Sequence, residues 1–254
     1  RRSLAFGCSP LVLGVPMVAV GTAAPEMAVS TGAVLNGQTG LAMGNVVGSN
    51  IFNVLFILGL SALIAPLVVH VQIIRQEVPI LMGASLLLLV LGLDGRISLT
   101  DGALLFGLLL AYTVFLVVQS RRETQAAQAE FEAEIHAPAA GAWDARLPVQ
   151  IALIVAGLAL LVLGSDWLVG AAVVFAKALG VSDLVIGLTI VAAGTSMPEV
   201  ATSVAAALKG ERDIDVGNVV GSSTFNMLGG LGLAGLVAGS EGLSVAPSLM
   251  AFDI

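Results

Sequence analysis

The 254-residue sequence contains little charge, few aromatic residues and a single cysteine. Only 11% of its residues are charged and 57% are hydrophobic, whereas soluble domains carry roughly 25% charged residues. So large an apolar share exceeds what one soluble core can bury, which excludes an ordinary water-soluble domain and indicates a protein embedded in lipid. One cysteine, Cys8, excludes an internal disulfide and a cysteine-based metal site.

Basic residues are also scarce, with 10 Lys and Arg against 17 Asp and Glu and a net charge of −7. They form no continuous stripe, so we expect no nucleic acid partner. The two histidines, His70 and His136, lie outside the apolar segments and leave no Cys/His cluster for zinc. Oxygen-bearing side chains are therefore the concentrated ligand chemistry of this chain.

Seven apolar segments approach or exceed the length that crosses a bilayer, which is about 17 to 25 helical residues. They cover residues 10–34, 41–64, 78–93, 99–118, 149–173, 184–208 and 216–238. We expect the short third segment to extend by a further turn. The charged segment 119–148 predicts a solvated loop. The sequence therefore predicts an all-α, multi-pass membrane protein.

The placement of Lys and Arg predicts the orientation in the membrane. If the connections alternate sides, eight basic residues lie on one side, and only Arg96 and Lys177 lie on the other. Cytoplasmic loops carry an excess of Lys and Arg. We therefore expect loop 119–148 to be cytoplasmic.

Two parts of the chain repeat one another at a constant offset of 173 residues. The sequence GTAAPE at 21–26 recurs as GTSMPE at 194–199, and GNVVGS at 44–49 recurs at 217–222. Residues 21–55 and 194–228 are identical at 18 of 35 positions, where shared composition would give roughly 3 or 4. Because the copies lie five spans apart, they cross the membrane in opposite directions, which is the inverted repeat of secondary transporters.

The same offset predicts the domain organisation. Ten helices in two sets of five would complete the repeat, and this chain holds seven of them. We expect 1–118 to be the first repeat half without its first helix. Segment 119–148 would be the connecting loop, and 149–254 the second half without its last two helices.

Glu26 and Glu199 are the glutamates that lie deep within the apolar segments. A charged side chain at the bilayer centre costs about 2.5–3.5 kcal/mol on insertion scales, so it rarely lies there without partners. Because the two residues occupy equivalent repeat positions, we expect them to meet near the pseudo-twofold axis. Two carboxylates would balance one Ca2+ or two Na+, or share a proton.

Two polar stripes run along the helices of the repeats, with residues at i, i+4 and i+8 on one face. The first stripe contains Thr22, Glu26 and Ser30, and in the second copy Thr195, Glu199 and Ser203. The second stripe contains Asn45, Ser49 and Asn53, and in the second copy Asn218, Ser222 and Asn226. Pro25 and Pro198 also release the carbonyls four residues before them from helical hydrogen bonds. Such oxygens suit Ca2+ and Na+.

Structural roles are an alternative for several of these residues. Ser30 and Ser203 are residue types that commonly hydrogen-bond between helices, and Asn45, Asn50 and Asn218 also fit a structural role. The Gly-x-x-x-Gly pairs at 44–48 and 217–221 favour close helix packing over binding. No His-Glu-x-x-His motif or Ser/Lys pair occurs in the apolar segments, so we do not expect an intramembrane enzyme.

These motifs resemble those of the calcium:cation antiporter superfamily, in particular the prokaryotic sodium/calcium exchangers. The pattern is G-T-x-x-P-E followed by G-N-V-V-G-S-x-x-F-N, at 21–53 and again at 194–226. The resemblance implies a ten-helix fold with four cation sites between the repeats. It also implies alternating access, in which two outer helices, one of them 149–173, slide against the core. Ca2+ and Na+ would be cargo, with no resident cofactor, and we expect a monomer in the lipid bilayer of the plasma (inner) membrane.

The resemblance also assigns roles by position. Glu26 and Glu199 would be the central ligands shared by Ca2+ and Na+. Backbone carbonyls would come from Ala19, Thr22, Ala192 and Thr195, hydroxyls from Ser49, Ser196 and Ser222, and Asn53 and Asn226 would face the middle of the cluster.

Two positions depart from the family pattern. Ala23 stands where Ser is usual, and Asn226 stands where many sodium/calcium exchangers have Asp. Thr22 and Thr195 stand where proton-coupled relatives usually carry Asn, which favours Na+. We therefore expect exchange of Ca2+ for Na+. Ca2+/H+ antiport is the first alternative, and a cation channel, which gains little from an inverted repeat, is the second.

Overall fold

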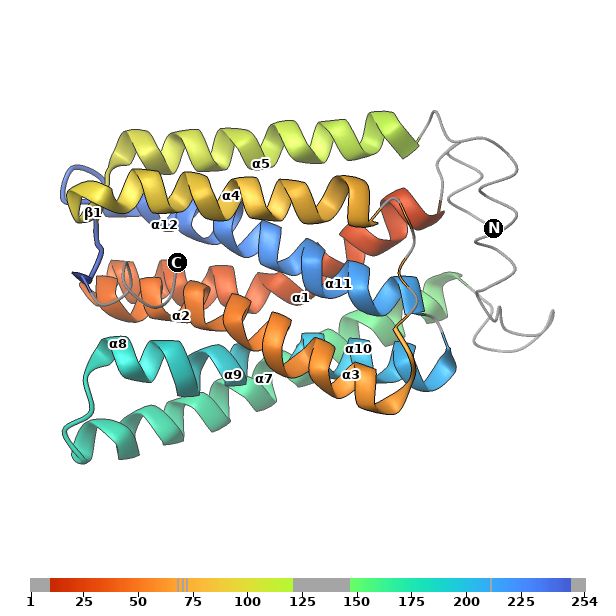
Figure 1. Cartoon of the computed structure of the whole chain (residues 1–254). Coiled ribbons are helices and arrows are strands. Elements are labelled where there is room, and N and C mark those ends of the chain that lie inside the picture. Colours follow the sequence, from red (N-terminus) through yellow and green to blue (C-terminus); the bar gives the residue numbers. More distant parts are fainter. Residues whose placement is uncertain are drawn as a thin grey trace.

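The computed structural model describes residues 10–67, 69, 71, 73–120, 147–210 and 212–247. It consists of long helices that lie roughly side by side along one direction (Figure 1). The loop predicted over 119–148 lies outside the described residues, except at its ends, where helices extend into it.

Helices account for nearly all of the first half. In chain order they are α1 (Pro10–Leu35), α2 (Thr39–Phe52), η2 (Asn53–Ile57), α3 (Leu58–Ile64), η3 (Ile73–Glu77), α4 (Val78–Leu91), η4 (Gly92–Asp94) and α5 (Leu99–Ser120). The elements α2, η2 and α3 form one span, Thr39–Ile64, and η3, α4 and η4 form another, Ile73–Asp94. The third predicted segment therefore starts earlier than residue 78, as its short length suggested.

The second half has the same all-helical character. Its helices are α7 (Leu147–Ala178), α8 (Asp183–Ile186), η6 (Gly187–Val191), α9 (Ala192–Thr195), α10 (Met197–Lys209), α11 (Arg212–Phe225), η7 (Asn226–Gly230) and α12 (Leu231–Ala238). Helices thus cover all seven predicted segments. By length and composition, four spans of the described chain are apolar enough to cross a membrane, and a fifth is a bent pair of helices.

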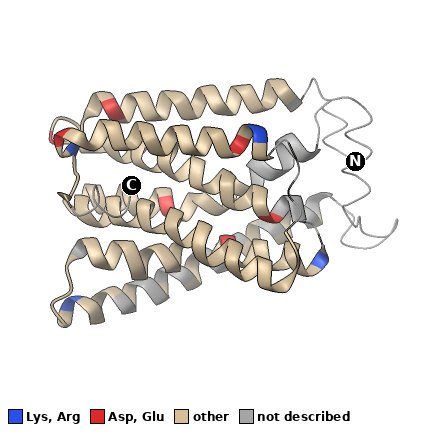
Figure 2. Cartoon of the chain, in the orientation of Figure 1, with Lys and Arg blue, Asp and Glu red and all other residues tan. Residues whose placement is uncertain are grey.

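The outer faces of the bundle are apolar and its interior is partly polar. Trp167 is 74% exposed and Leu160 is 71% exposed, whereas Glu26 and Asn45 are completely buried. Exposed apolar faces of this extent are typical of a surface covered by lipid. Figure 2 shows Lys and Arg near the helix ends, while some acidic residues lie midway along the bundle.

The two repeats interleave in space. Helix α1 packs against α11, and α2 packs against α8, η6 and α9. Glycine permits the second contact, because a Cβ on Gly44 would lie 2.8 Å from the backbone oxygen of Leu184. A Cβ on Gly187 would lie 2.7 Å from the backbone oxygen of Leu41. The close helix packing predicted from the first Gly-x-x-x-Gly pair is therefore confirmed.

A short strand pair, which the sequence did not predict, also joins the halves. Strand β1 (Arg96–Ile97) follows α4, and β2 (Leu243–Ser244) follows α12. They pair antiparallel, with Arg96 opposite Ser244 and Ile97 opposite Leu243. Gly95, at φ +83°, makes the turn into β1 in a conformation that favours glycine.

Candidate cation site between the two repeats

The predicted site residues gather where the two repeats meet. Glu26 of α1 and Glu199 of α10 are both completely buried and lie close enough to interact electrostatically. The other predicted residues are also buried, each at most 2% exposed: Ala19, Thr22, Ser49, Asn53, Ala192, Thr195, Ser196, Ser222 and Asn226. The structure therefore brings all of them into the protein interior.

Two equivalent hydrogen bonds connect the repeats. Thr22 Oγ1 donates to Asn218 Oδ1 at 3.3 Å, and Thr195 Oγ1 donates to Asn45 Oδ1 at 3.0 Å. Exchanging the repeats converts one bond into the other, as an inverted repeat requires. The site is therefore built around an approximate twofold axis, and neither repeat supplies it alone.

The same asparagines bind the serines of their own repeat. Asn45 Nδ2 donates to Ser30 Oγ at 2.9 Å, and Asn218 Nδ2 donates to Ser203 Oγ at 3.3 Å. Asn45 Nδ2 also donates to the backbone oxygen of Glu26 at 3.2 Å. These bonds agree with the structural role considered for the asparagines and serines, because they connect the threonines and the Glu26 backbone to the neighbouring helices.

The alanine carbonyls that the resemblance names lie beside the threonines. Thr22 Oγ1 lies 3.3 Å from the oxygen of Ala19, and Thr195 Oγ1 lies 3.2 Å from the oxygen of Ala192. The oxygen of Ala192 also accepts the backbone N–H of Ser196 at 3.0 Å. A carbonyl oxygen has two lone pairs, so the second one is available either to the Thr195 hydroxyl or to another partner.

The two carboxylates have different surroundings. Ser196 Oγ donates to Glu26 Oε1 at 3.0 Å, and Glu26 Oε2 has no partner in the described part of the chain. Neither oxygen of Glu199 meets a hydrogen-bond donor there, although Thr22 is close by. The residue equivalent to Ser196 is Ala23, which has no hydroxyl. The departure noted in the sequence therefore leaves Glu199 without the hydrogen bond that Glu26 has.

Asn53 and Asn226 each begin a π-helical turn. Residue 53 starts η2 and residue 226 starts η7, at the repeat offset. Asn53 Nδ2 donates to Ser222 Oγ at 3.2 Å, but Asn53 Oδ1 and both amide atoms of Asn226 lack partners within the described chain. Single π-helical turns are frequent at functional sites. Sequence reasoning missed these turns, and the asparagine inside an apolar run was the available signal.

The two prolines have different effects on their helices. The second copy breaks at Ser196, between α9 and α10, where the helix axis bends by 45°. Pro198 lies in the first turn of α10, where its missing N–H costs nothing. In the first copy, α1 continues through Pro25 to Leu35.

The unpartnered oxygens suit a hard cation. Among the described residues they are Glu26 Oε2, Glu199 Oε1, Glu199 Oε2, Asn53 Oδ1 and Asn226 Oδ1. Buried polar atoms are nearly always paired, so these oxygens are candidate ligands for a cation. No three His, Cys, Asp or Glu side chains in the described ranges form a metal-binding group. Carboxylate and amide oxygens without imidazole or thiolate favour Ca2+ or Na+ over transition metals.

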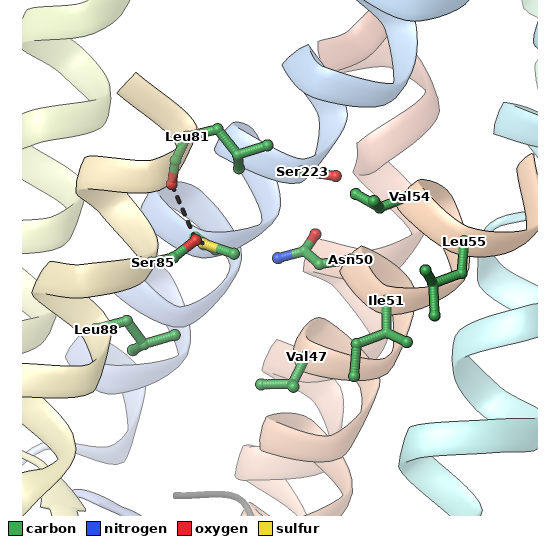
Figure 3. A pocket seen from close by; sticks show the side chains of 10 residues that line it. Val47, Asn50, Ile51, Val54, Leu55, Leu81, Ser85, Leu88 and Ser223 are labelled. Carbon is green, nitrogen blue, oxygen red and sulfur yellow. Dashed lines mark hydrogen bonds between the residues drawn. The ribbon is translucent and has the colours of Figure 1, made fainter. Parts of the chain in front are cut away.

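A cavity of about 310 Å³ lies next to this site, between α2, η2, α4, α11 and η7. Asn50 and Ser223, which are equivalent repeat positions, line it together with apolar side chains (Figure 3). Asn50 is 7% exposed, and neither its amide atoms nor the Ser223 hydroxyl has a partner in the described structure. The cavity adjoins the site through the chain neighbours Ser49 and Ser222.

Comparison with known proteins identifies the family. The family model described as sodium/calcium exchanger protein matches residues 2–118 and 149–254. The chain belongs to this family. The resemblance found in the sequence is therefore confirmed. The family model does not match residues 119–148, which are the predicted loop.

Relatives of this exchanger include the inner membrane protein YrbG of Escherichia coli (strain K12). It is 38% identical over 240 residues, which are 93% of this chain and 72% of the relative. Sodium/calcium exchanger MaX1 of Methanosarcina acetivorans is 31% identical over 260 residues, covering 91% of this chain and 74% of the relative.

Solved structures of the sodium-calcium exchanger NCX_Mj share the fold. One, soaked with 2.5 mM Na+ and 10 mM Sr2+, has a TM-score of 0.74 and 32% identity, and the match covers 99% of this chain and 78% of that one. The predicted fold class is confirmed, and this exchanger is a multi-pass membrane protein.

Proposed function

We propose that this exchanger carries Ca2+ and Na+ in opposite directions through the site between its repeats. The observation that carries this proposal is the buried pair Glu26 and Glu199, whose oxygens lack enough hydrogen-bond donors within the described chain. Two carboxylates balance one Ca2+ or two Na+, so the two ions compete for the same charge. The protein then carries one cargo or the other, which is the condition for exchange.

Alternating access would expose this site to each side of the membrane in turn. The glutamates are completely buried, so a helix must move before an ion enters or leaves. Helix α7 packs along α9, η6 and α10, beside the bent segment that carries Ser196. Sliding of α7 and its repeat counterpart against the core would open the site, since transporters of this type move one bundle against another around a fixed site.

We further infer that the exchanger works as a monomer in the plasma (inner) membrane, with segment 119–148 in the cytoplasm. The uneven distribution of Lys and Arg supports this orientation. Arg75 and Lys209 lie in the described helices of the side that we assign to the cytoplasm.

Ca2+/H+ antiport is the second candidate. Glu199 lacks the hydroxyl that Glu26 receives from Ser196, and Asn226 supplies an amide in place of an acid. A site with fewer ligands for Na+ favours protons as the counter-ion, because two adjacent buried carboxylates can share a proton.

Vesicles containing the full-length protein decide between these candidates. We expect Na+-loaded vesicles to accumulate radioactive Ca2+, and K+-loaded vesicles at clamped pH to accumulate none. Uptake that ignores Na+ but follows an outward proton gradient would replace the Na+/Ca2+ proposal with Ca2+/H+ antiport. Ca2+ flux without any counter-ion would contradict both and support a channel.

A further inference from the structure

A third buried carboxylate, Asp215, lies outside the site described above. It occupies the first part of α11 and is 1% exposed. Its equivalent in the first repeat is Ala42, so the repeat itself does not require an acid at this position. The contacts of Asp215, and not the repeat pattern, must therefore account for the acid at this position.

Two serines from two other helices surround this carboxylate. Ser61 Oγ of α3 donates to Asp215 Oδ1 at 2.9 Å. The hydroxyl of Ser203, on α10, also interacts with the carboxylate. Asp215 Oδ2 has no hydrogen-bond partner in the described part of the chain. Three helices therefore enclose a carboxylate that has one unsatisfied oxygen.

A chain of buried polar side chains links Asp215 to the central pair. Ser203 accepts a hydrogen bond from Asn218 Nδ2, and Asn218 Oδ1 accepts one from Thr22, which lies beside Glu199. Asp215, Asn218 and Ser222 follow one another at i, i+3 and i+7, so they share a face of α11. At 1.5 Å rise per residue, Asp215 lies about 10 Å along the helix from Ser222.

The first repeat has no such extension. Ser30 Oγ donates to the backbone oxygen of Ala42 at 3.4 Å, and the polar stripe ends there with a methyl group. The stripe of the second repeat alone continues to a carboxylate, and it does so toward one end of the bundle. The same end holds the last residues of α3 and α10 and the helix ends that flank 121–146 (Figure 1).

Apolar side chains pack beside Asp215. Ile73, Val216 and Val220 form a buried cluster, against which Leu58 and Leu67 pack. An ion that moves along the polar face of α11 between this end and Glu199 would pass Asp215, because Asp215 precedes Asn218 and Ser222 on that face. The carboxylate thus lies near the start of α11, on the polar face that leads to the central site and next to this apolar cluster.

A purely structural role explains part of this arrangement. A carboxylate near a helix N-terminus interacts favourably with the helix dipole, and the bond from Ser61 ties α3 to α11. However, burying a charged oxygen without a partner is unfavourable. A bond that only ties α3 to α11 needs Asp215 Oδ1 alone, and this structural role leaves the burial of Asp215 Oδ2 unexplained.

We propose that Asp215, Ser61 and Ser203 form an access site for the transported cation, on the route between this end of the bundle and the central glutamates. This inference rests on the proposed function. The ligands would be the Asp215 carboxylate and the two serine hydroxyls, with water completing the shell of a hard cation. Three protein ligands hold an ion less firmly than the central site, which suits a position that an ion must also leave.

The test measures the apparent KM for Ca2+ separately at each face of the full-length protein, in vesicles of defined orientation. Asp215→Asn keeps an acceptor for Ser61 and removes the charge. We expect the KM at the face nearer Asp215 to rise about tenfold, because a unit charge close to the ion is lost. The KM at the opposite face and the maximal rate should stay within about twofold. Ser61→Ala should raise the same KM less, because it removes a neutral ligand.

Glu241→Gln is the matched control, because Glu241 is exposed and lies outside both sites. Asp215→Ala, which introduces the residue present at position 42, serves as a second charge-removing variant should Asp215→Asn fail to fold. Wild-type KM at both faces, or an equal rise at both, would overturn the access site. If Asp215→Ala and Ser61→Ala lose equal thermal stability while their KM values stay unchanged, the access site is also overturned. That result is expected if the Ser61–Asp215 bond only ties α3 to α11. Absence of exchange in the wild type would instead overturn the proposed function.

Discussion

The two copies of the repeated motif share half of their residues but differ in their backbones. In the first copy, α1 continues as a helix through Pro25, and in the second the chain breaks at Ser196 and bends by 45°. The break coincides with the serine whose hydroxyl reaches Glu26, and the unbroken copy has Ala23 instead. The threonine–asparagine bonds that frame the site are nevertheless the same in both copies.

The frame of hydrogen bonds around the candidate site is symmetric, whereas the surroundings of the two carboxylates are not. Glu26 accepts a hydrogen bond from a serine of the other repeat, whereas neither oxygen of Glu199 has a hydrogen-bond partner in the described part of the chain. The polar stripe differs in the same sense, because it ends at Ala42 in one copy and at Asp215 in the other. Both features that break the symmetry of the repeats, Ser196 and Asp215, therefore lie in the second repeat.

The largest effect is expected from Glu199→Gln. The substitution leaves an amide where a carboxylate must balance the ion, and breaking a buried charge pair on one side costs about 3–5 kcal/mol. Ca2+ uptake should fall to background in vesicles, while the protein remains inserted and folded by size-exclusion chromatography. Glu241→Gln provides the control. Retained uptake would remove Glu199 from the site.

Gly48→Ala should destabilise the protein more than Gly221→Ala, the equivalent change in the second copy. A Cβ on Gly48 would collide with the backbone of Leu188, whereas one on Gly221 would meet the Ala19 side chain at 2.9 Å. Overpacking costs about 1–3 kcal/mol, and more where backbone must move. Thermal unfolding of the purified protein measures both variants, and equal losses would show that the two packing contacts are equivalent.

Ser196→Ala should raise the KM for Ca2+ by about tenfold, because a hydrogen bond to a charged group contributes about 1.5–3 kcal/mol. The variant leaves neither glutamate with a serine donor, so it removes this one difference in hydrogen bonding between the copies. Concentration-dependent uptake measures the change, and exposed Ser244→Ala is the control. Wild-type affinity would mean that the serine does not orient Glu26 for binding.

Ala23→Ser should have the smallest effect, a decrease in KM of about threefold, since one new hydrogen bond contributes about 0.5–1.5 kcal/mol. It restores the hydroxyl that the repeat predicts beside Glu199. Uptake driven by Na+ and by protons should be compared in the same vesicles, because the added oxygen favours Na+. An unchanged KM and counter-ion preference would indicate that the hydroxyl cannot reach Glu199 from an unbroken helix.

Much of this architecture could be predicted from local patterns. Apolar length located the spans, and the offset of 173 residues placed Glu26 and Glu199 in one site. The π-helical turns at Asn53 and Asn226, the break at Ser196 and the β1–β2 pair were missed. These features depend on which backbone hydrogen-bond partners form once the helices pack together. Composition and periodicity carry no information about that choice.

Asp215 is a different kind of omission. It lies at the very start of an apolar span, where an acid usually indicates only the membrane surface. Aligning the two copies would have exposed it, because an aspartate stands opposite Ala42. Departures from an internal repeat are therefore as informative as its identities.

The hydrogen bond from Thr22 to Asn218 joins residues that are 196 positions apart. At a synthesis rate of about 5–20 residues per second, the second residue is made roughly 10 to 40 s after the first. Glu26 therefore enters the membrane long before the helices that complete its surroundings exist. During that interval the first half must accommodate Glu26 in the membrane without the second repeat that later surrounds it. The order of synthesis therefore makes the unfinished chain the stage at which this buried acid is least stabilised.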